Sequence, residues 1–69
     1  GRPDEALPHL QQAWELFPDP EVASHLGEVL WVLGQQDEAR RIWRDAMQRK
    51  PDNTLVPAAV ERLTGSPTP

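Results

Sequence analysis

The fold is decided by residues 20–53, which read PEVASHLGEVLWVLGQQDEARRIWRDAMQRKPDN. Apolar residues recur there every three or four positions in two stretches, which is the spacing of one helix face. They are Val22, Leu26, Val29, Leu30 and Leu33 in the first stretch, and Ala39, Ile42, Trp43, Ala46 and Met47 in the second. Gly34 follows the first stretch and Pro51 follows the second, at positions where these residues end helices. We therefore predict helices over residues 21–33 and 37–49.

A third helix is predicted over residues 4–17, before this stretch. Its apolar residues also follow helical spacing, up to the Pro-Asp-Pro sequence at 18–20. Pro8 lies inside it and removes an internal hydrogen bond, so we expect the helix to begin late or to bend at that residue.

A short last helix is predicted over residues 55–63. Thr54 precedes it as the expected N-cap, and Gly65 follows as the expected end. The remaining residues, 64–69, are rich in Ser, Thr and Pro, and we expect them to form a flexible tail.

The chain also repeats itself at a shift of 33 residues. The matching positions are Gly1 with Gly34, Asp4-Glu5-Ala6 with Asp37-Glu38-Ala39, Ala13 with Ala46, and Pro18-Asp19 with Pro51-Asp52. A period of this length indicates a stacked array of supersecondary units rather than a closed domain.

Residues at fixed positions of this repeat resemble the tetratricopeptide repeat signature. They are Leu26-Gly27, Leu30, Gly34, Asp37-Glu38-Ala39, Trp43, Ala46 and Pro51. The resemblance implies an all-α fold: a fragment of a helix-turn-helix solenoid with about four helices. Small residues at Gly27, Ala39 and Ala46 fit this reading, because they let paired helices approach closely.

The resemblance also implies how the chain divides. Residues 1–19 correspond to the second helix of a truncated repeat and 20–53 to a complete repeat. Residues 54–63 lack the Leu-Gly pair and carry Val60-Glu61 instead, so we expect a C-terminal capping helix, near the end of a longer parent protein. The flexible tail completes the chain.

Composition excludes several classes of function. Eleven acidic and seven basic residues give a net charge of −4, which argues against a nucleic-acid partner. No apolar run is long enough to insert into a membrane. The chain has no cysteine, and no catalytic constellation or phosphate loop stands out. We therefore expect a non-enzymatic protein with no cofactor.

Partner binding is predicted on the first helix of the complete repeat, because in this family that helix lines a concave groove. Its outward stripe is Glu21, Ser24, Glu28 and Trp31, spaced three, four and three residues apart. Trp31 would then be an aromatic anchor flanked by carboxylates, suited to a basic or amphipathic segment. The alternative is that Trp31 packs on the terminal helix near Ala58.

Two other clusters are candidate sites. Arg40, Arg41 and Arg44 form a secondary basic surface that would attract an acidic partner or a membrane surface, or are a solvated helix face. His25 and Glu28 lie three residues apart on one helix, but without a third ligand we expect no metal site.

The predicted function is a protein–protein interaction module, a scaffold or adaptor that binds a peptide or partner protein on its concave face. The alternative is a structural or self-assembly segment that caps a solenoid, with self-association through the exposed face of helix 4–17. The stretches His25-Leu26-Gly27-Glu28-Val29-Leu30-Trp31, Asp37-Glu38-Ala39-Arg40 and Ile42-Trp43 are also similar to the last repeats of tetratricopeptide lipoproteins of Gram-negative bacteria. That similarity implies a periplasmic protein held at the outer membrane by an upstream anchor; a cytoplasmic protein is the alternative.

Overall fold

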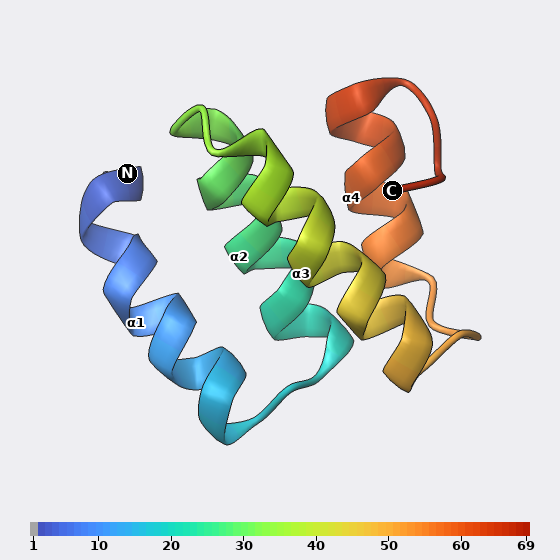
Figure 1. Cartoon of the computed structure of the whole chain (residues 1–69), viewed down its shortest axis with the longest axis horizontal. Helices are drawn as coiled ribbons and strands as arrows, with labels where there is room; N and C mark the ends of the chain where they lie inside the picture. The colour runs from blue at the N-terminus through green and yellow to red at the C-terminus, as the bar shows by residue number, and fades with distance from the viewer. Residues whose placement is uncertain (1) are drawn as a thin grey trace.

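The computed structural model describes residues 2–69 as four α-helices joined by short connections. They are α1 (Pro3–Leu16), α2 (Pro20–Val32), α3 (Gln36–Arg49) and α4 (Leu55–Thr64). Successive helices run in opposite directions (Figure 1). The all-α prediction is confirmed, and each helix begins and ends within one residue of its predicted bounds.

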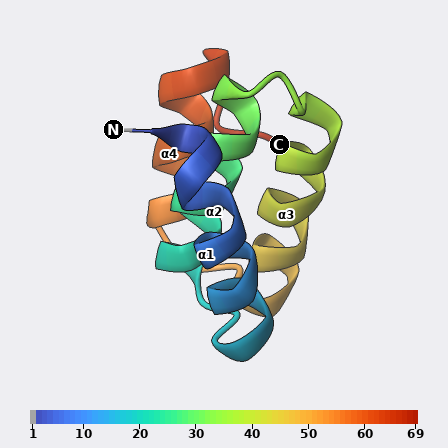
Figure 2. The ribbon, with the colours of Figure 1, turned by 90° about the vertical axis from the view of Figure 1, so that its left-hand side faces the viewer.

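Helix α2 occupies the centre of the molecule, and each of the other three helices packs against it. Helices α1 and α4 flank α2 on opposite sides, while α3 lies across a third side and also contacts α4 (Figures 1 and 2). The central position of α2 leaves one side of that helix uncovered, and this uncovered side is where a binding surface has room to form.

The core consists of apolar side chains from α2, α3 and α4. Its fully enclosed members are Ala23, Leu26, Leu30, Ala39, Ile42, Trp43, Ala46, Val56 and Val60. Leu7, Leu10 and Trp14 of α1 are only partly buried against it. Helix α1 therefore contributes less to the core than the other helices do.

Gly27 allows the largest core side chain to fit. A Cβ atom at this position would lie 1.9 Å from Nε1 of Trp43, closer than any real contact. The expectation that Gly27 permits a close approach is confirmed, although the neighbour is an indole ring rather than the backbone of the paired helix. Trp43 Nε1 finds no hydrogen-bond partner among the described residues, so the ring is held by packing alone.

Backbone and side-chain hydrogen bonds define the ends of α2. Asp19 caps its N-terminus, accepting a bond of 3.0 Å from the Val22 amide. At its C-terminus Gly34 has φ +86°. The amides of Gly34 and Gln35 donate to the carbonyls of Trp31 and Leu30, which is the Schellman arrangement that glycine favours.

The N-terminus of α4 differs from the prediction. Thr54 makes no capping bond; instead, the Asn53 side chain accepts a 2.9 Å bond from the Val56 amide and donates a 2.6 Å bond to the Lys50 carbonyl. An amide side chain carries both a donor and an acceptor, so Asn53 can connect the end of α3 to the start of α4. Gly65 ends α4 with φ +87°, as predicted.

Pro8 lies inside α1, at the sixth position of the helix. Since α1 begins at Pro3, the missing amide of Pro8 deprives only the Asp4 carbonyl of its usual partner. The helix therefore does not begin late: it starts one residue before the predicted Asp4 and contains Pro8.

Candidate binding surface

The uncovered side of α2, here called the front face, carries Glu21, His25, Glu28 and Val32. Their spacing of four, three and four residues puts them on one stripe, opposite the core residues Leu26 and Leu30. Glu21, His25 and Val32 are exposed and Glu28 is half-buried. The front face therefore combines two carboxylates, an imidazole and an apolar side chain.

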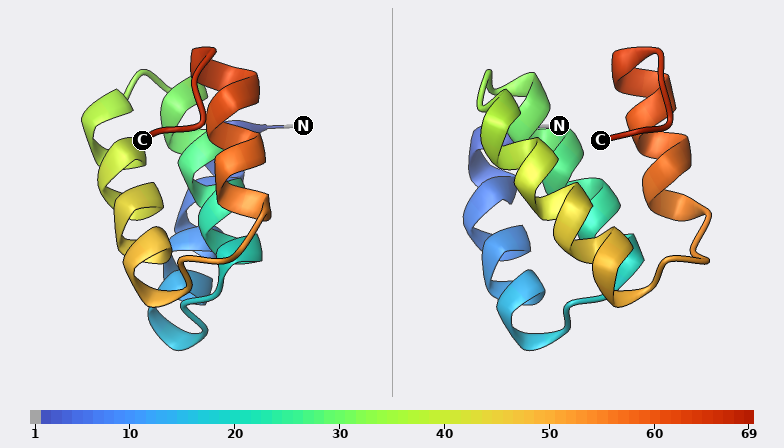
Figure 3. Two further views of the ribbon diagram at one scale, coloured as in Figure 1. Left: turned by 90° about the vertical axis from the view of Figure 1, so that its right-hand side faces the viewer. Right: turned by 45° about the vertical axis from the view of Figure 1, so that its right-hand side comes forward.

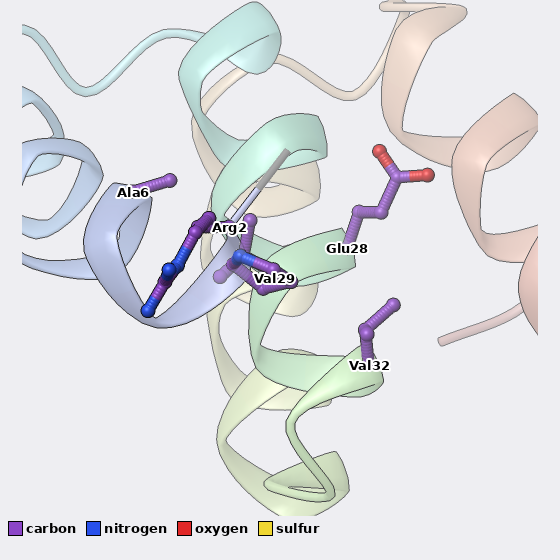
Figure 4. Close-up of a pocket in the computed structure, with 6 residues that line it drawn as sticks. Arg2, Ala6, Glu28, Val29 and Val32 are labelled. Atoms are coloured by element: carbon purple, nitrogen blue, oxygen red, sulfur yellow. The ribbon is translucent and has the colours of Figure 1, made fainter.

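An ion pair connects the front face to α4. Arg62 Nη1 of α4 lies 2.6 Å from Glu28 Oε1, and Figure 4 shows the Glu28 carboxylate extending toward the α4 ribbon. Pairs this exposed contribute about 0–1 kcal/mol to stability. Glu28 can therefore exchange Arg62 for another cation at little cost.

A cavity of about 300 Å³ opens between α1 and the end of α2, beside the front face. Its apolar walls come from Pro3, Ala6, Val29 and Val32, and its polar walls from Arg2 and Glu28 (Figure 4). Arg2 Nε also lies 3.6 Å from Glu5 Oε1. The cavity thus presents an apolar floor with charged groups at its edge.

Trp31 lies on the flank of α2 that faces α3, off the front-face stripe. It is half-buried, with its ring centroid 5.9 Å from that of Trp43 and the Arg40 guanidinium 5.1 Å above it. Ser24 is also half-buried, and its hydroxyl donates to the Glu21 carbonyl at 3.0 Å. Of the four predicted binding residues, Glu21 and Glu28 share the front face, whereas Ser24 and Trp31 turn toward its flank.

Sequence reasoning missed His25 and Val32 as members of the front face. Both lie four residues from a predicted member, Glu21 or Glu28, so helical spacing could have found them. The α1 residues of the cavity left no such signal, because their place beside α2 depends on how the two helices pack.

The three predicted basic residues make different contacts. Arg41 makes a two-point ion pair with Glu38, with Nε 2.9 Å from Oε1, whereas Arg40 and Arg44 both point to the main-chain oxygen of Pro69. The hydrogen bonds from Arg41 lower the pKa of Glu38, and Glu38 raises the pKa of Arg41. Arg41 is thus engaged within its own helix.

We expect Glu38→Gln to reduce stability by about 0.3–0.5 kcal/mol at neutral pH, the usual contribution of an exposed pair on one helix. Because the Glu38 pKa is lowered on folding, its contribution is present above the unfolded value of about 4.3 and is lost as pH falls through the folded value. Urea unfolding at pH 7 and pH 3 measures this. The control is Asp37→Asn, which removes a neighbouring acid of the first turn; an equal loss of pH dependence in both variants would contradict the assignment.

Residues 2–69 contain no group of three or more His, Cys, Asp or Glu side chains placed to hold a metal ion. Within the same residues, no helix combines the length and apolar character needed to cross a bilayer.

Comparison with known proteins bears on residues 1–63. A search of curated proteins found no match. A family model described as tetratricopeptide repeat matches residues 1–63. This match spans all four helices and agrees with the helix-turn-helix packing around α2. The chain belongs to the tetratricopeptide repeat family.

Proposed function

We propose that the front face of α2 and the adjoining cavity bind a peptide segment of a partner protein. Tetratricopeptide repeats generally mediate protein–protein interaction, and the family is typically a non-catalytic scaffold. In our proposal the partner contacts the side of α2 that no other helix covers. It makes the chain a scaffold or adaptor rather than a catalyst.

The cavity is the observation that carries this proposal. Its volume of about 300 Å³ is at the lower limit of ligand pockets, so it suits one or two apolar side chains of a peptide. Val32 is 60% exposed at its edge, and an apolar group seated there would remove this surface from water. The cavity thus selects an apolar side chain at one position of the partner.

The carboxylates of the front face indicate which charged residues the partner needs. Glu21 is exposed and makes no ion pair among the described residues, and Glu28 has only the exposed contact with Arg62. A lysine or arginine next to the apolar side chain would pair with Glu28, and a second basic residue about two turns of α2 further along the partner would pair with Glu21. The supported partner is therefore an amphipathic, basic segment.

Selection from a random linear peptide library on the purified chain tests this chemistry. We expect recovered peptides to share an apolar residue flanked by basic residues. Val32→Lys should weaken their binding about tenfold, equivalent to 1.4 kcal/mol. The lysine puts a positive charge at the edge of the cavity, where it repels the basic residues of the peptide. Fluorescence anisotropy of a labelled selected peptide measures the change.

The control is Gln48→Lys, which adds the same charge to an exposed position of α3 and should leave affinity unchanged. Peptides without basic residues, or equal losses in the two variants, would refute the front-face proposal.

Self-assembly is the second candidate, and one observation favours it. Leu16 and Phe17, at the end of α1, are 63% and 67% exposed, an apolar surface of the kind that marks contacts between proteins. Sedimentation equilibrium separates the candidates. A mass that rises with concentration and is restored to the monomer by Phe17→Lys, but not by Val32→Lys, supports self-assembly.

A further inference from the structure

The end of α3 that leads into α4 carries the only sulfur atom of the chain. The sequence has one methionine and no cysteine, and this methionine, Met47, lies in the last turn of α3. Figure 3 shows the short connection that runs from this end of α3 to the start of α4. Chemistry that acts on sulfur therefore acts at one place in the chain, next to this connection.

The Met47 sulfur contacts the residue that caps α4. Nδ2 of Asn53 donates to Met47 Sδ at 3.3 Å and to the Lys50 carbonyl at 2.6 Å. Oδ1 of the same side chain accepts a 2.9 Å bond from the amide of Val56, a fully buried residue. The nitrogen and the oxygen belong to one planar amide group, so a shift of the nitrogen also shifts the oxygen that holds the first turn of α4.

Met47 is accessible to small oxidants, because its side chain is half-buried against the core rather than enclosed by it. A thioether reacts with a hydroperoxide to give a sulfoxide. The sulfur donates an electron pair to one peroxide oxygen, so that an S–O bond forms and the O–O bond breaks. The leaving oxygen takes up the proton and departs as an alcohol, or as water from hydrogen peroxide. Sulfur is oxidised by two electrons, and the peroxide is reduced by two.

The sulfoxide does not fit the contact with Asn53. Sulfur and nitrogen already lie at hydrogen-bonding distance, so there is no room for an oxygen atom between them. The added oxygen also makes an apolar side chain polar, which weakens its packing on the core. If Met47 turns outward, Asn53 loses the side chain against which it rests; if Asn53 moves instead, its bond to Lys50 is lost. Both movements weaken the cap of α4.

We propose that Met47 is a site of reversible oxidation by hydroperoxides, and that its sulfoxide releases the first turn of α4 from Asn53. Methionine sulfoxide reductases reverse this modification, so the fold carries a redox-sensitive switch on the docking of one helix. The proposal is independent of peptide binding, since neither residue lies on the front face.

Treatment of the full chain with dilute hydrogen peroxide tests the proposal. We expect the intact mass to rise by one oxygen atom, which peptide mapping should place on Met47. The melting temperature should fall by roughly 4–8 °C, as for loss of one helix cap, and both sulfoxide reductases together should restore it. Hydrogen exchange at the Val56 amide should become about fivefold faster. The Val22 amide, which Asp19 caps in the same manner at the start of α2, is the internal control and should be unchanged.

Two variants separate release of the cap from other effects of oxidation. Met47→Leu has no sulfur and should keep its mass and its melting temperature in peroxide. Asn53→Ala removes the cap beforehand and should lose little further stability when Met47 is oxidised. Unchanged exchange at Val56 in the oxidised chain would overturn the proposal, as would oxygen found on a tryptophan instead of Met47. So would an equal loss of melting temperature in the Asn53→Ala background, because the loss would then come from the polarity of the sulfoxide alone.

Discussion

Gly27→Ala is expected to destabilise the chain by about 2 kcal/mol, although alanine is the better helix former. The added methyl would lie 1.9 Å from Nε1 and 2.4 Å from Cε2 of Trp43. Overpacking of this kind costs about 3 kcal/mol at its upper range, and the gain in helix propensity returns about 1 kcal/mol. Thermal unfolding followed by circular dichroism should show a melting temperature lower by roughly 8–16 °C.

A double-mutant cycle with Trp43→Leu assigns this loss to the indole. Leucine lacks the ring whose Nε1 and Cε2 atoms the methyl would meet, so Gly27→Ala should cost at least about 0.5 kcal/mol less in that background. Additive effects of the two substitutions, or a melting temperature unchanged by Gly27→Ala alone, would show that the close approach does not limit stability.

The helices could be predicted from the sequence because each one carries its own signals. Helical periodicity located α2 and α3, and Gly34 and Gly65 marked helix ends that require positive φ. The cap of α4 could not be predicted in the same way. Thr54 and Asn53 are both good capping residues, and the choice of Asn53 depends on its second bond to Lys50, a contact that exists only after the α3–α4 connection has formed.

The candidate site was predictable only in part. Glu21 and Glu28 were found because helical spacing fixes which α2 residues share a side. Spacing does not show how α2 is rotated relative to α3 and α4. For this reason Trp31 was predicted to lie on the same stripe as Glu21 and Glu28. In the structure Trp31 packs against Trp43 and Arg40. The contacts of the basic residues show the same limit: the acidic partner of Arg41 is three residues away and visible in the sequence, while the partner of Arg44 is 25 residues away.

These differences have a common physical cause. Bonds within one helix depend on neighbours in the sequence, and the sequence shows them directly. Contacts between helices depend on rotation and translation of whole elements, which the summed packing of the core determines. The proposed binding surface is built from contacts between helices, so a substitution that undocks a helix should remove the surface without altering its residues.

Val60→Asp is the substitution expected to undock α4 with the largest effect. Val60 is fully buried and belongs to the same core cluster as Leu30 and Trp43. Removing its side chain from the interior forfeits about 1.5–3 kcal/mol. A carboxylate left there without a partner adds a further penalty of about 1–3 kcal/mol. The sum is comparable to the total stability of roughly 3–10 kcal/mol for a domain of this size, so we expect the chain to be largely unfolded at neutral pH.

Ala58→Asp provides the matched control, because Ala58 is exposed and lies in the first turn of the same helix. A carboxylate there interacts favourably with the helix dipole, so its melting temperature should equal or exceed that of the wild type. Burial raises the pKa of an aspartate, so Val60→Asp should regain part of its helicity as pH falls below that raised pKa and the carboxyl group becomes neutral. Helicity that is native-like at pH 7 would mean that α4 does not dock through Val60. The Glu28–Arg62 pair beside the front face would then lack its structural support.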